Sequence, residues 1–205
     1  SRKAFTTSTP NLRLAAEAFQ KGDFLQALKL CDECLRVQSK DVNARHLKGR
    51  CLTMGGLFEL AKKELQAALA LMPNNPGILV SLAKVDVELG DTELGIAKLS
   101  AALHQKPDHE EAALTRGYLL ERLGRIEQAM EDLQKITDAS PLYESALRGM
   151  SLLHLNAREY SLAIDWSQKI LDRVPEGNKL YHEAAMIQGR ALDKLGEVDK
   201  AMISW

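Results

Sequence analysis

The stretch that decides the fold is residues 110–141, EEAALTRGYLLERLGRIEQAMEDLQKITDASP. Its apolar and small residues recur at steps of three and four on either side of Leu123-Gly124-Arg125, which predicts two amphipathic helices joined by a tight turn. Gly124 falls where the first helix ends, because glycine enters the left-handed conformation of a helix C-terminus without a Cβ penalty. Pro141 predicts the end of the second helix, because proline lacks an N–H and clashes with the preceding turn.

The same hairpin recurs along the chain with a period of 34 residues. The small residue of the first helix recurs at Ala15, Gly49, Ala83, Gly117, Ser151 and Gly189, the last interval being 38 residues. The turn glycine recurs at Gly22, Gly56, Gly90, Gly124 and Gly196, the second-helix alanine at Ala27, Ala61, Ala129, Ala163 and Ala201, and the closing proline at Pro73, Pro107, Pro141 and Pro175. This period predicts an array in which each hairpin buries its apolar stripe against its neighbours.

A helical hairpin of 34 residues with small, glycine, alanine and proline residues at these positions resembles the tetratricopeptide repeat family. The resemblance covers about residues 9–205. It implies an all-α, right-handed α-solenoid of five complete hairpins and a truncated sixth. The expected units are residues 8–41, 42–75, 76–109, 110–143, 144–177 and 182–205, after a linker or flanking segment at residues 1–9, with Pro10 at the first helical position.

Three departures from the pattern carry expectations of their own. Gly95 replaces the second-helix alanine in the third unit, which predicts either a weak point or a close helix crossing. Arg158 replaces the fifth turn glycine, so the turn is expected to shift toward Asn156, a residue that tolerates the left-handed conformation. The four extra residues near Glu176–Tyr181 predict that the first helix of the sixth unit is lengthened at its N-terminus.

Composition narrows the function classes. The formal net charge is −1, with 27 Lys and Arg against 28 Asp and Glu. Proteins that bind nucleic acid need a basic stripe to neutralise phosphates, so a nucleic-acid partner is not expected. The sequence contains no apolar run long enough for a membrane span and no secretory leader pattern. Three cysteines without a disulfide-scaffold spacing favour a reducing, cytoplasmic setting.

The ends of the sequence suggest a longer protein. The chain starts at Ser1 and stops at Trp205, inside the expected second helix of the sixth unit. Repeat arrays normally end in a capping helix with a polar outer face. We therefore expect the natural chain to continue past Trp205, and we expect the uncapped end to be capable of self-association.

No catalytic, metal or cofactor site is predicted. Cys31 and Cys34 form a C-x-x-C pair that Cys51 could approach, but they occupy inward-facing places of the second helix and are interpreted as small core residues. His104 and His109 flank a proline turn and are expected to be solvated. The histidines lack the i, i+4 spacing of a helical metal site, and no phosphate-binding loop or nucleophile elbow is present.

By resemblance to the tetratricopeptide repeat family, the first helices line a concave groove. The residues predicted to form a peptide-binding site there are Arg50, Lys84, Val87, Leu114, Tyr118, Arg148, Leu152, Leu155 and Arg190. Basic residues interleaved with apolar ones suit a peptide or helix that carries carboxylates between apolar anchors. The alternative for these positions is that they are ordinary solvated cations and partly buried apolar residues.

The function expected from these observations is that of a non-catalytic scaffold that binds a partner protein in the groove. A second hypothesis is a recognition arm of a larger enzyme, because the ending GRALDKLGEVDKAMISW resembles the last repeat before the catalytic part of bacterial repeat-containing sulfotransferases. The two hypotheses differ in whether a catalytic domain lies beyond Trp205.

Overall fold

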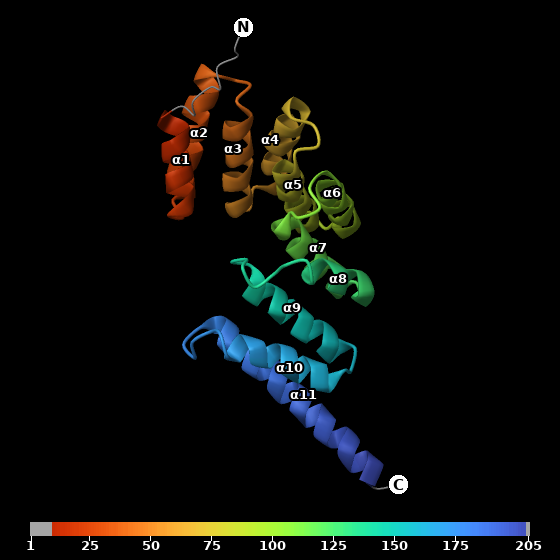
Figure 1. Ribbon diagram of the computed structural model, residues 1–205. Coiled ribbons are helices and arrows are strands. Elements are labelled where there is room, and N and C mark those ends of the chain that lie inside the picture. Colours follow the sequence, from red (N-terminus) through yellow and green to blue (C-terminus); the bar gives the residue numbers. More distant parts are fainter. Residues whose placement is uncertain (1–9, 204–205) are drawn as a thin grey trace. The chain divides into compact units, whose positions relative to one another are not determined.

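The computed structural model describes residues 10–203, which form eleven α-helices and no strand (Figure 1). The helices are α1 (Pro10–Gln20), α2 (Phe24–Val37), α3 (Val42–Met54), α4 (Phe58–Leu71), α5 (Pro76–Glu88), α6 (Thr92–Gln105), α7 (Glu110–Arg122), α8 (Ile126–Leu133), α9 (Tyr143–Asn156), α10 (Tyr160–Leu171) and α11 (Lys179–Ile203). The predicted all-α class and the helical hairpins are confirmed. Pro10 is the first residue of α1, as expected.

The chain divides into two compact units, Ser1–Pro107 and Asp108–Trp205. The first unit holds the hairpins α1–α2, α3–α4 and α5–α6, and the second holds α7–α8, α9–α10 and α11. In the first unit, each buried cluster combines apolar residues from successive hairpins. Leu12 of α1, Leu30 of α2 and Leu47 of α3 lie in one buried cluster, while Leu65 of α4 and Leu82 of α5 lie in the next.

The turns follow the glycine pattern, with one substitution. Gly22, Gly56, Gly90 and Gly124 have φ values of 81°, 73°, 92° and 72°, in the left-handed region that glycine adopts without strain. The expectation that Asn156 would take over this role in the fifth hairpin is wrong. Asn156 is the last residue of α9, and Arg158 itself adopts a φ of 63°. The packing of α9 against α10 therefore imposes the turn geometry on a residue that does not favour it.

The hairpin of residues 110–141 has the shortest second helix. The prediction that this helix extends to the proline is wrong, because α8 ends at Leu133, eight residues before Pro141. The chain leaves the helix through Ile136, which is buried, and then turns at Thr137, whose carbonyl accepts the N–H of Ser140. The Ser140 Oγ–H donates to Glu110 Oε2 at 2.6 Å and ties this turn to the start of α7.

The last helix departs from the hairpin pattern. The sequence predicts a turn at Gly196, but α11 continues through that residue as a single helix of 25 residues. A continuous helix keeps one backbone hydrogen bond per residue, whereas a turn breaks several of them and is stable only if new packing contacts compensate. The predicted N-terminal lengthening is confirmed. α11 begins ten residues before Gly189, whereas α7 begins seven residues before the equivalent Gly117.

Gly95 marks a close crossing between α5 and α6. A Cβ atom at this position would lie 2.7 Å from Val87 Cγ2 and 3.0 Å from the carbonyl oxygen of Ala83. Such distances are below van der Waals contact, so α6 approaches α5 more closely than an alanine would allow. Of the two alternatives that the sequence left open, the structure shows the close crossing.

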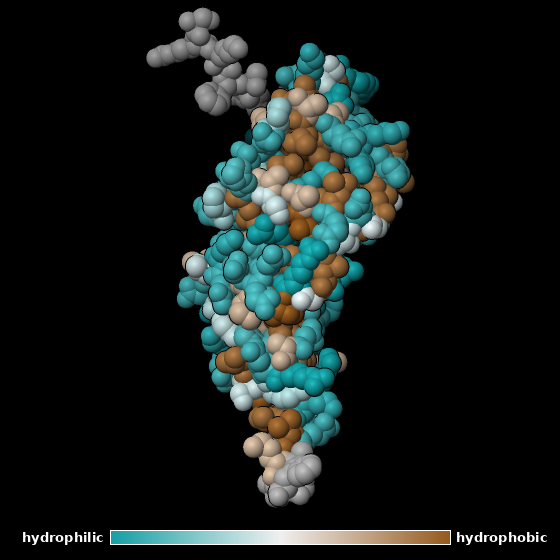
Figure 2. All heavy atoms as spheres, turned by 90° about the vertical axis from the view of Figure 1, so that its right-hand side faces the viewer, coloured by the Kyte–Doolittle hydropathy of each residue, from teal (hydrophilic) through white to brown (hydrophobic). Residues whose placement is uncertain are grey.

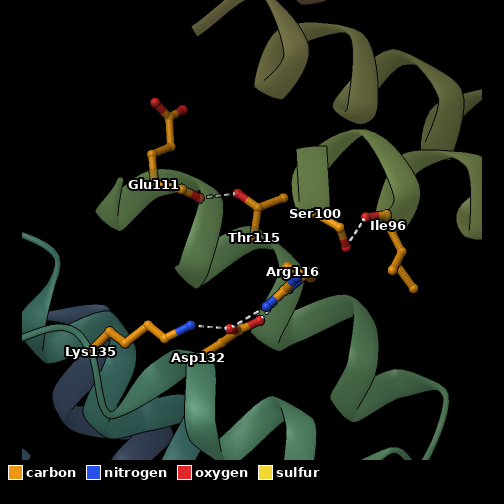
Figure 3. A network of polar contacts seen from close by, with 7 residues as sticks. All are labelled: Ile96, Ser100, Glu111, Thr115, Arg116, Asp132 and Lys135. Atoms are coloured by element: carbon orange, nitrogen blue, oxygen red, sulfur yellow. Dashed lines mark hydrogen bonds and ion pairs between the residues drawn. The ribbon is translucent and has the colours of Figure 1, made fainter. Parts of the chain in front are cut away.

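Two fully buried carboxylates hold neighbouring helices together. Asp86 of α5 forms ion pairs with Lys62 of α4, at 2.8 Å, and Lys98 of α6, at 2.5 Å. Asp132 of α8 accepts two hydrogen bonds from the Arg116 guanidinium of α7, at 2.6 and 2.7 Å, and one from Lys135 at 3.1 Å (Figure 3). Each buried charge is paired with cations that remain partly exposed, which limits the desolvation penalty.

Candidate partner-binding faces

The first helices of the N-terminal unit carry a mixed polar and aromatic surface, which we call the N-terminal face: Phe19, His46, Arg50, Ser81 and Lys84. It comes from α1, α3 and α5, and α3 contacts both of the others. His46 Nε2 lies 2.8 Å from Ser81 Oγ, a hydrogen bond that joins α3 to α5. Lys84 is exposed one turn after Ser81 on α5, and Val87, half-buried, follows after another turn.

Arg50 is an exposed cationic group of this face. Its side chain is exposed, and its guanidinium carbon lies 4.4 Å from the centre of the Phe19 ring. A cation above an aromatic ring keeps its N–H donors available at the edges of the guanidinium plane. Arg50 and Phe19 together therefore offer hydrogen-bond donors for a carboxylate beside an apolar surface.

The C-terminal unit carries a second surface, which we call the C-terminal face: Leu114, Tyr118, Arg148, Leu152, Leu155 and Arg190. It comes from α7, α9 and α11, and α9 contacts both of the others. The Arg148 guanidinium carbon lies 5.7 Å from the centre of the Tyr118 ring. The Tyr118 hydroxyl donates to the carbonyl of Ser145, and burial raises the pKa of Tyr118. The aromatic ring is thus fixed between α7 and α9.

Arg148 already has a carboxylate partner. Its Nε atom lies 2.6 Å from Glu183 Oε2, and both side chains are about one third exposed, at 36% and 30%. The repeat pattern did not single out Glu183. The signal that could have identified it is its position seven residues before Arg190, two helical turns away on the same helix. This ion pair makes Arg148 a weaker candidate for a partner's carboxylate than Arg50.

A cleft of about 610 Å³ lies between the turn of the fifth hairpin and α11. It brings together two predicted site residues, Leu155 and Arg190, with residues that the repeat pattern did not assign to the site. Its lining is Leu155, Asn156, Arg158, Tyr160, Arg190, Asp193, Lys194 and Glu197. The charges in this lining are mixed, so the cleft suits a polar segment of a protein better than a simple anion.

The predicted site residues thus fall into separate groups. Arg50, Lys84 and Val87 belong to the N-terminal unit, and the other six belong to the C-terminal unit. Tyr118 lies against Arg148, and Leu155 shares a cleft with Arg190. Leu114 and Leu152 are half-buried on their helices, and Leu155 is buried, with 7% of its surface exposed. Apolar contact on the C-terminal face therefore comes mainly from Leu114, Tyr118 and Leu152.

The cysteines and histidines lie where packing and capping explain them. Cys31, Cys34 and Cys51 are buried free thiols in one apolar cluster, consistent with their interpretation as core residues. The expectation that His109 is solvated is wrong, because it is half-buried and its Nδ1 accepts the Ala112 N–H at the start of α7. Among residues 10–203, no group of three or more His, Cys, Asp or Glu side chains is placed to hold a metal ion.

No helix in the described part of the chain has both the length and the apolar character needed to cross a bilayer.

Comparison with known proteins agrees with the repeat pattern. The profile of the tetratricopeptide repeat family matches residues 12–76 and 80–144. A curated relative, DnaJ homolog subfamily C member 3 from Bos taurus, is 28% identical over 137 residues, which cover 65% of this chain and 27% of the relative. The chain thus spans about a quarter of the length of that relative.

Two solved structures show the same fold. One is PilW, described as a widely conserved type IV pilus biogenesis factor, with a TM-score of 0.78 at 19% identity, over 96% of this chain and 94% of that one. The other is YrrB, described as a tetratricopeptide repeat protein with an unusual peptide-binding site, with a TM-score of 0.66 at 19% identity, over 89% and 92% of the two chains. With the family profile matching more than half of the sequence, the chain belongs to the tetratricopeptide repeat family.

Proposed function

We propose that this chain is a non-catalytic scaffold in which the first-helix face of each unit, taken by itself, offers a binding surface for a segment of a partner protein. The observation that carries the proposal is the Arg50–Phe19 pair, an exposed guanidinium stacked on an aromatic ring. Arginine and aromatic residues are enriched where protein interfaces gain most of their binding energy. The chemistry favours a partner segment in which acidic residues alternate with apolar ones.

The two faces differ in how ready they are to bind such a segment. On the N-terminal face, Arg50 and Lys84 are exposed. On the C-terminal face, the Glu183 carboxylate already occupies Arg148, and a partner's carboxylate must compete with it. We therefore assign the acidic residues of a bound segment to Arg50 and Lys84 of the N-terminal face. The C-terminal face, considered separately, offers apolar contact through Leu114, Tyr118 and Leu152.

The comparisons support an interaction role at the level of the fold. Tetratricopeptide repeats are typical of protein–protein interaction scaffolds, and YrrB is described as having a peptide-binding site. The second hypothesis, a recognition arm of a larger enzyme, differs only in the domain to which the arm is attached. The same surface variants test the binding face in both cases.

The test uses a peptide display library of random segments panned against the purified chain. We expect the selected peptides to be enriched in Asp and Glu next to apolar residues. A selected peptide should bind an Arg50→Glu variant about ten-fold or more weakly, as measured by fluorescence anisotropy, because a hydrogen bond to a charged group contributes roughly 1.5–3 kcal/mol.

The matched control is Arg36→Glu, which makes the same charge change on the second helix α2, where Arg36 is 77% exposed. It should leave the affinity within about two-fold, since surface substitutions away from an interface have small effects. Equal weakening by both variants would show that only net charge matters and would contradict the proposed face. Selected peptides without acidic residues would contradict the assigned partner chemistry.

A further inference from the structure

The fourth hairpin differs from the others in how its second helix ends. α8 has eight residues, whereas α2, α4, α6 and α10 have 12 to 14. The 34-residue period aligns α6 with residues 126–139, so α8 lacks the counterpart of the last six residues of α6. Residues 134–139 leave the helix and run in turns toward α9. Surface that a full-length second helix would cover is therefore left to this connecting segment.

The connecting segment also lacks an aliphatic residue that the other hairpins have. At one position near the end of the second helix, the other four complete hairpins have a leucine: Leu35, Leu69, Leu103 and Leu171. Leu103 is buried, and the other three are partly buried against the apolar clusters. The fourth hairpin has Thr137 at this position, and its side chain is exposed. The place that leucine occupies elsewhere is thus not filled by the chain itself.

A cleft of about 260 Å³ lies beside Thr137. Most of its lining is apolar and comes from the end of α8, the connecting segment, α9 and α10: Leu133, Ile136, Tyr143, Leu147, Met150 and Trp166. The three residues of α9 are spaced by four and three and form one side of that helix, which is not the side that carries Leu152 and Leu155. Pockets for drug-sized molecules are typically about 300–1,000 Å³, so this cleft suits a single side chain better.

The mouth of the cleft is polar. Gln134, Thr137 and Asp138 line it and are exposed. Within residues 10–203, the Asp138 carboxylate forms no ion pair, whereas Lys135, three residues earlier, is paired with Asp132 at 3.1 Å. On the side of the molecule shown in Figure 2, hydrophobic residues likewise reach the surface in patches bordered by hydrophilic ones. A carboxylate beside an apolar cleft favours a ligand that carries a positive charge next to an apolar group.

The Trp166 wall of the cleft is held in place by neighbouring side chains. Lys169 Nζ lies 3.8 Å from the centre of the Trp166 ring. The His154 ring is nearly parallel to it, with an interplanar angle of 7° and 6.3 Å between the ring centres. His154 Nδ1 is in turn 2.7 Å from Glu159 Oε2. A wall that is already ordered lowers the entropic cost of binding.

We infer that this cleft, beside the shortened second helix of the fourth hairpin, binds an aliphatic side chain of a partner protein that has a Lys or Arg next to it. The aliphatic side chain takes the place that leucine fills in the other four hairpins, and the basic residue faces Asp138. The site differs from the first-helix faces in both location and chemistry, because the N-terminal face favours acidic segments and this cleft favours a basic one.

The experiment pans a peptide display library against a chain that carries Arg50→Glu, so that the N-terminal face contributes no selected peptides. We expect the selected peptides to share Leu, Ile or Met next to Lys or Arg. Adding Thr137→Leu supplies the missing side chain from the chain itself and should weaken a selected peptide about ten-fold or more in fluorescence anisotropy. Ala146→Leu fills the cleft from α9 and should have the same effect in a chain that circular dichroism shows to be folded.

The matched control for Thr137→Leu is Ala139→Leu, which adds the same side chain at an exposed position outside the lining of the cleft. It should leave the affinity within about two-fold. Asp138→Lys should weaken the peptide about three-fold or more, and added salt should reduce this effect. Glu127→Lys makes the same charge change at an exposed position of α8 and should change the affinity by less than about two-fold.

The proposed site is ruled out if no selected peptide is weakened by Thr137→Leu or Ala146→Leu, or if Ala139→Leu weakens the peptides equally. Selected peptides that lack basic residues, or that bind the Asp138→Lys chain as tightly as the parent, contradict the assigned partner chemistry. A dimer in sedimentation that Thr137→Leu dissociates would identify a second copy as the occupant and would also overturn the proposal. None of these results depends on peptide binding at Arg50.

Discussion

Arg158 adopts the backbone conformation that Gly124 adopts at the same position of the preceding hairpin, with φ values of 63° and 72°. The left-handed conformation costs a residue with a Cβ atom roughly 1–2 kcal/mol. Glycine avoids this cost, but it loses more backbone entropy on folding, which offsets part of its advantage. The fifth hairpin is therefore held in place by the packing of α9 on α10 despite its turn residue.

An Arg158→Gly variant should relieve this strain. We expect the free energy of unfolding to rise by about 0.5–1 kcal/mol in urea titrations followed by circular dichroism. Arg158→Ala is the control, because it shortens the side chain and keeps the strain, and it should give no such gain. A glycine variant that is no more stable than the alanine variant would show that the turn is unstrained.

The stability of the fold around the buried Asp86 carboxylate should depend on its two lysine partners. Replacing both Lys62 and Lys98 by methionine leaves a fully buried charge without a partner, and we expect a loss of about 3 kcal/mol in the free energy of unfolding. Adding Asp86→Leu removes the orphaned charge and should recover most of this loss. The measurement is a set of urea titrations on the three chains. A double lysine variant that loses less than about 1 kcal/mol would refute this account.

Gly95 should resist substitution even though alanine is the residue that the other repeats use. Alanine gains roughly 1 kcal/mol of helix propensity, but its Cβ atom would lie 2.7 Å from Val87 Cγ2 and 3.0 Å from a backbone carbonyl. Overpacking of this kind typically costs about 1–3 kcal/mol, so we expect a net loss of about 1 kcal/mol in thermal or urea unfolding. A Gly95→Ala chain that is more stable than the parent would show that α6 can move away from α5 freely.

The three thiols should be unreactive in the folded chain. The hydrogen bond between Cys31 and Cys51 raises the pKa of the Cys31 thiol and lowers the pKa of the Cys51 thiol, so the low reactivity rests on burial, since the three cysteines are only 0 to 3% exposed. We expect their reaction with a disulfide reagent to be about a hundred-fold or more slower in buffer than in urea, since access requires local unfolding. A thiol that reacts in buffer as fast as free cysteine would point to a site other than core packing.

The 34-residue period was sufficient to predict the helical hairpins, because apolar spacing, glycine turns and prolines act locally on the backbone. The predictions that were wrong concern places where tertiary packing determines the backbone conformation. Arg158 is left-handed because two packed helices require it, and α8 ends early because buried Ile136 and the Ser140–Glu110 contact direct the chain. At Gly196 the local signal fits both a turn and a helix, so the sequence pattern alone could not distinguish them.

The candidate faces were predictable in part for a similar reason. Spacing on the first helices predicted that Tyr118 and Arg148 share one surface, and the structure places the guanidinium over the ring. Spacing does not reveal which charges neutralise each other between helices, so the pairing of Arg148 with Glu183 required the structure. The division of the predicted residues between two units has no signal in the repeat pattern, because the period continues through Pro107.

The ion pairs within the hairpins limit which helices can be exchanged between repeats. Glu64 and Asp132 sit three residues after their second-helix alanines and pair with Lys48 and Arg116 of the preceding helices. The third hairpin has the opposite polarity, with Lys98 at that position and Asp86 as its partner. If α4 or α8 took the place of α6, Glu64 or Asp132 would replace Lys98 and would face the buried Asp86 carboxylate. Although the repeats share one pattern, α4, α6 and α8 are each matched by charge to the first helix of their own hairpin, so exchanging α6 with α4 or α8 would require a compensating charge change.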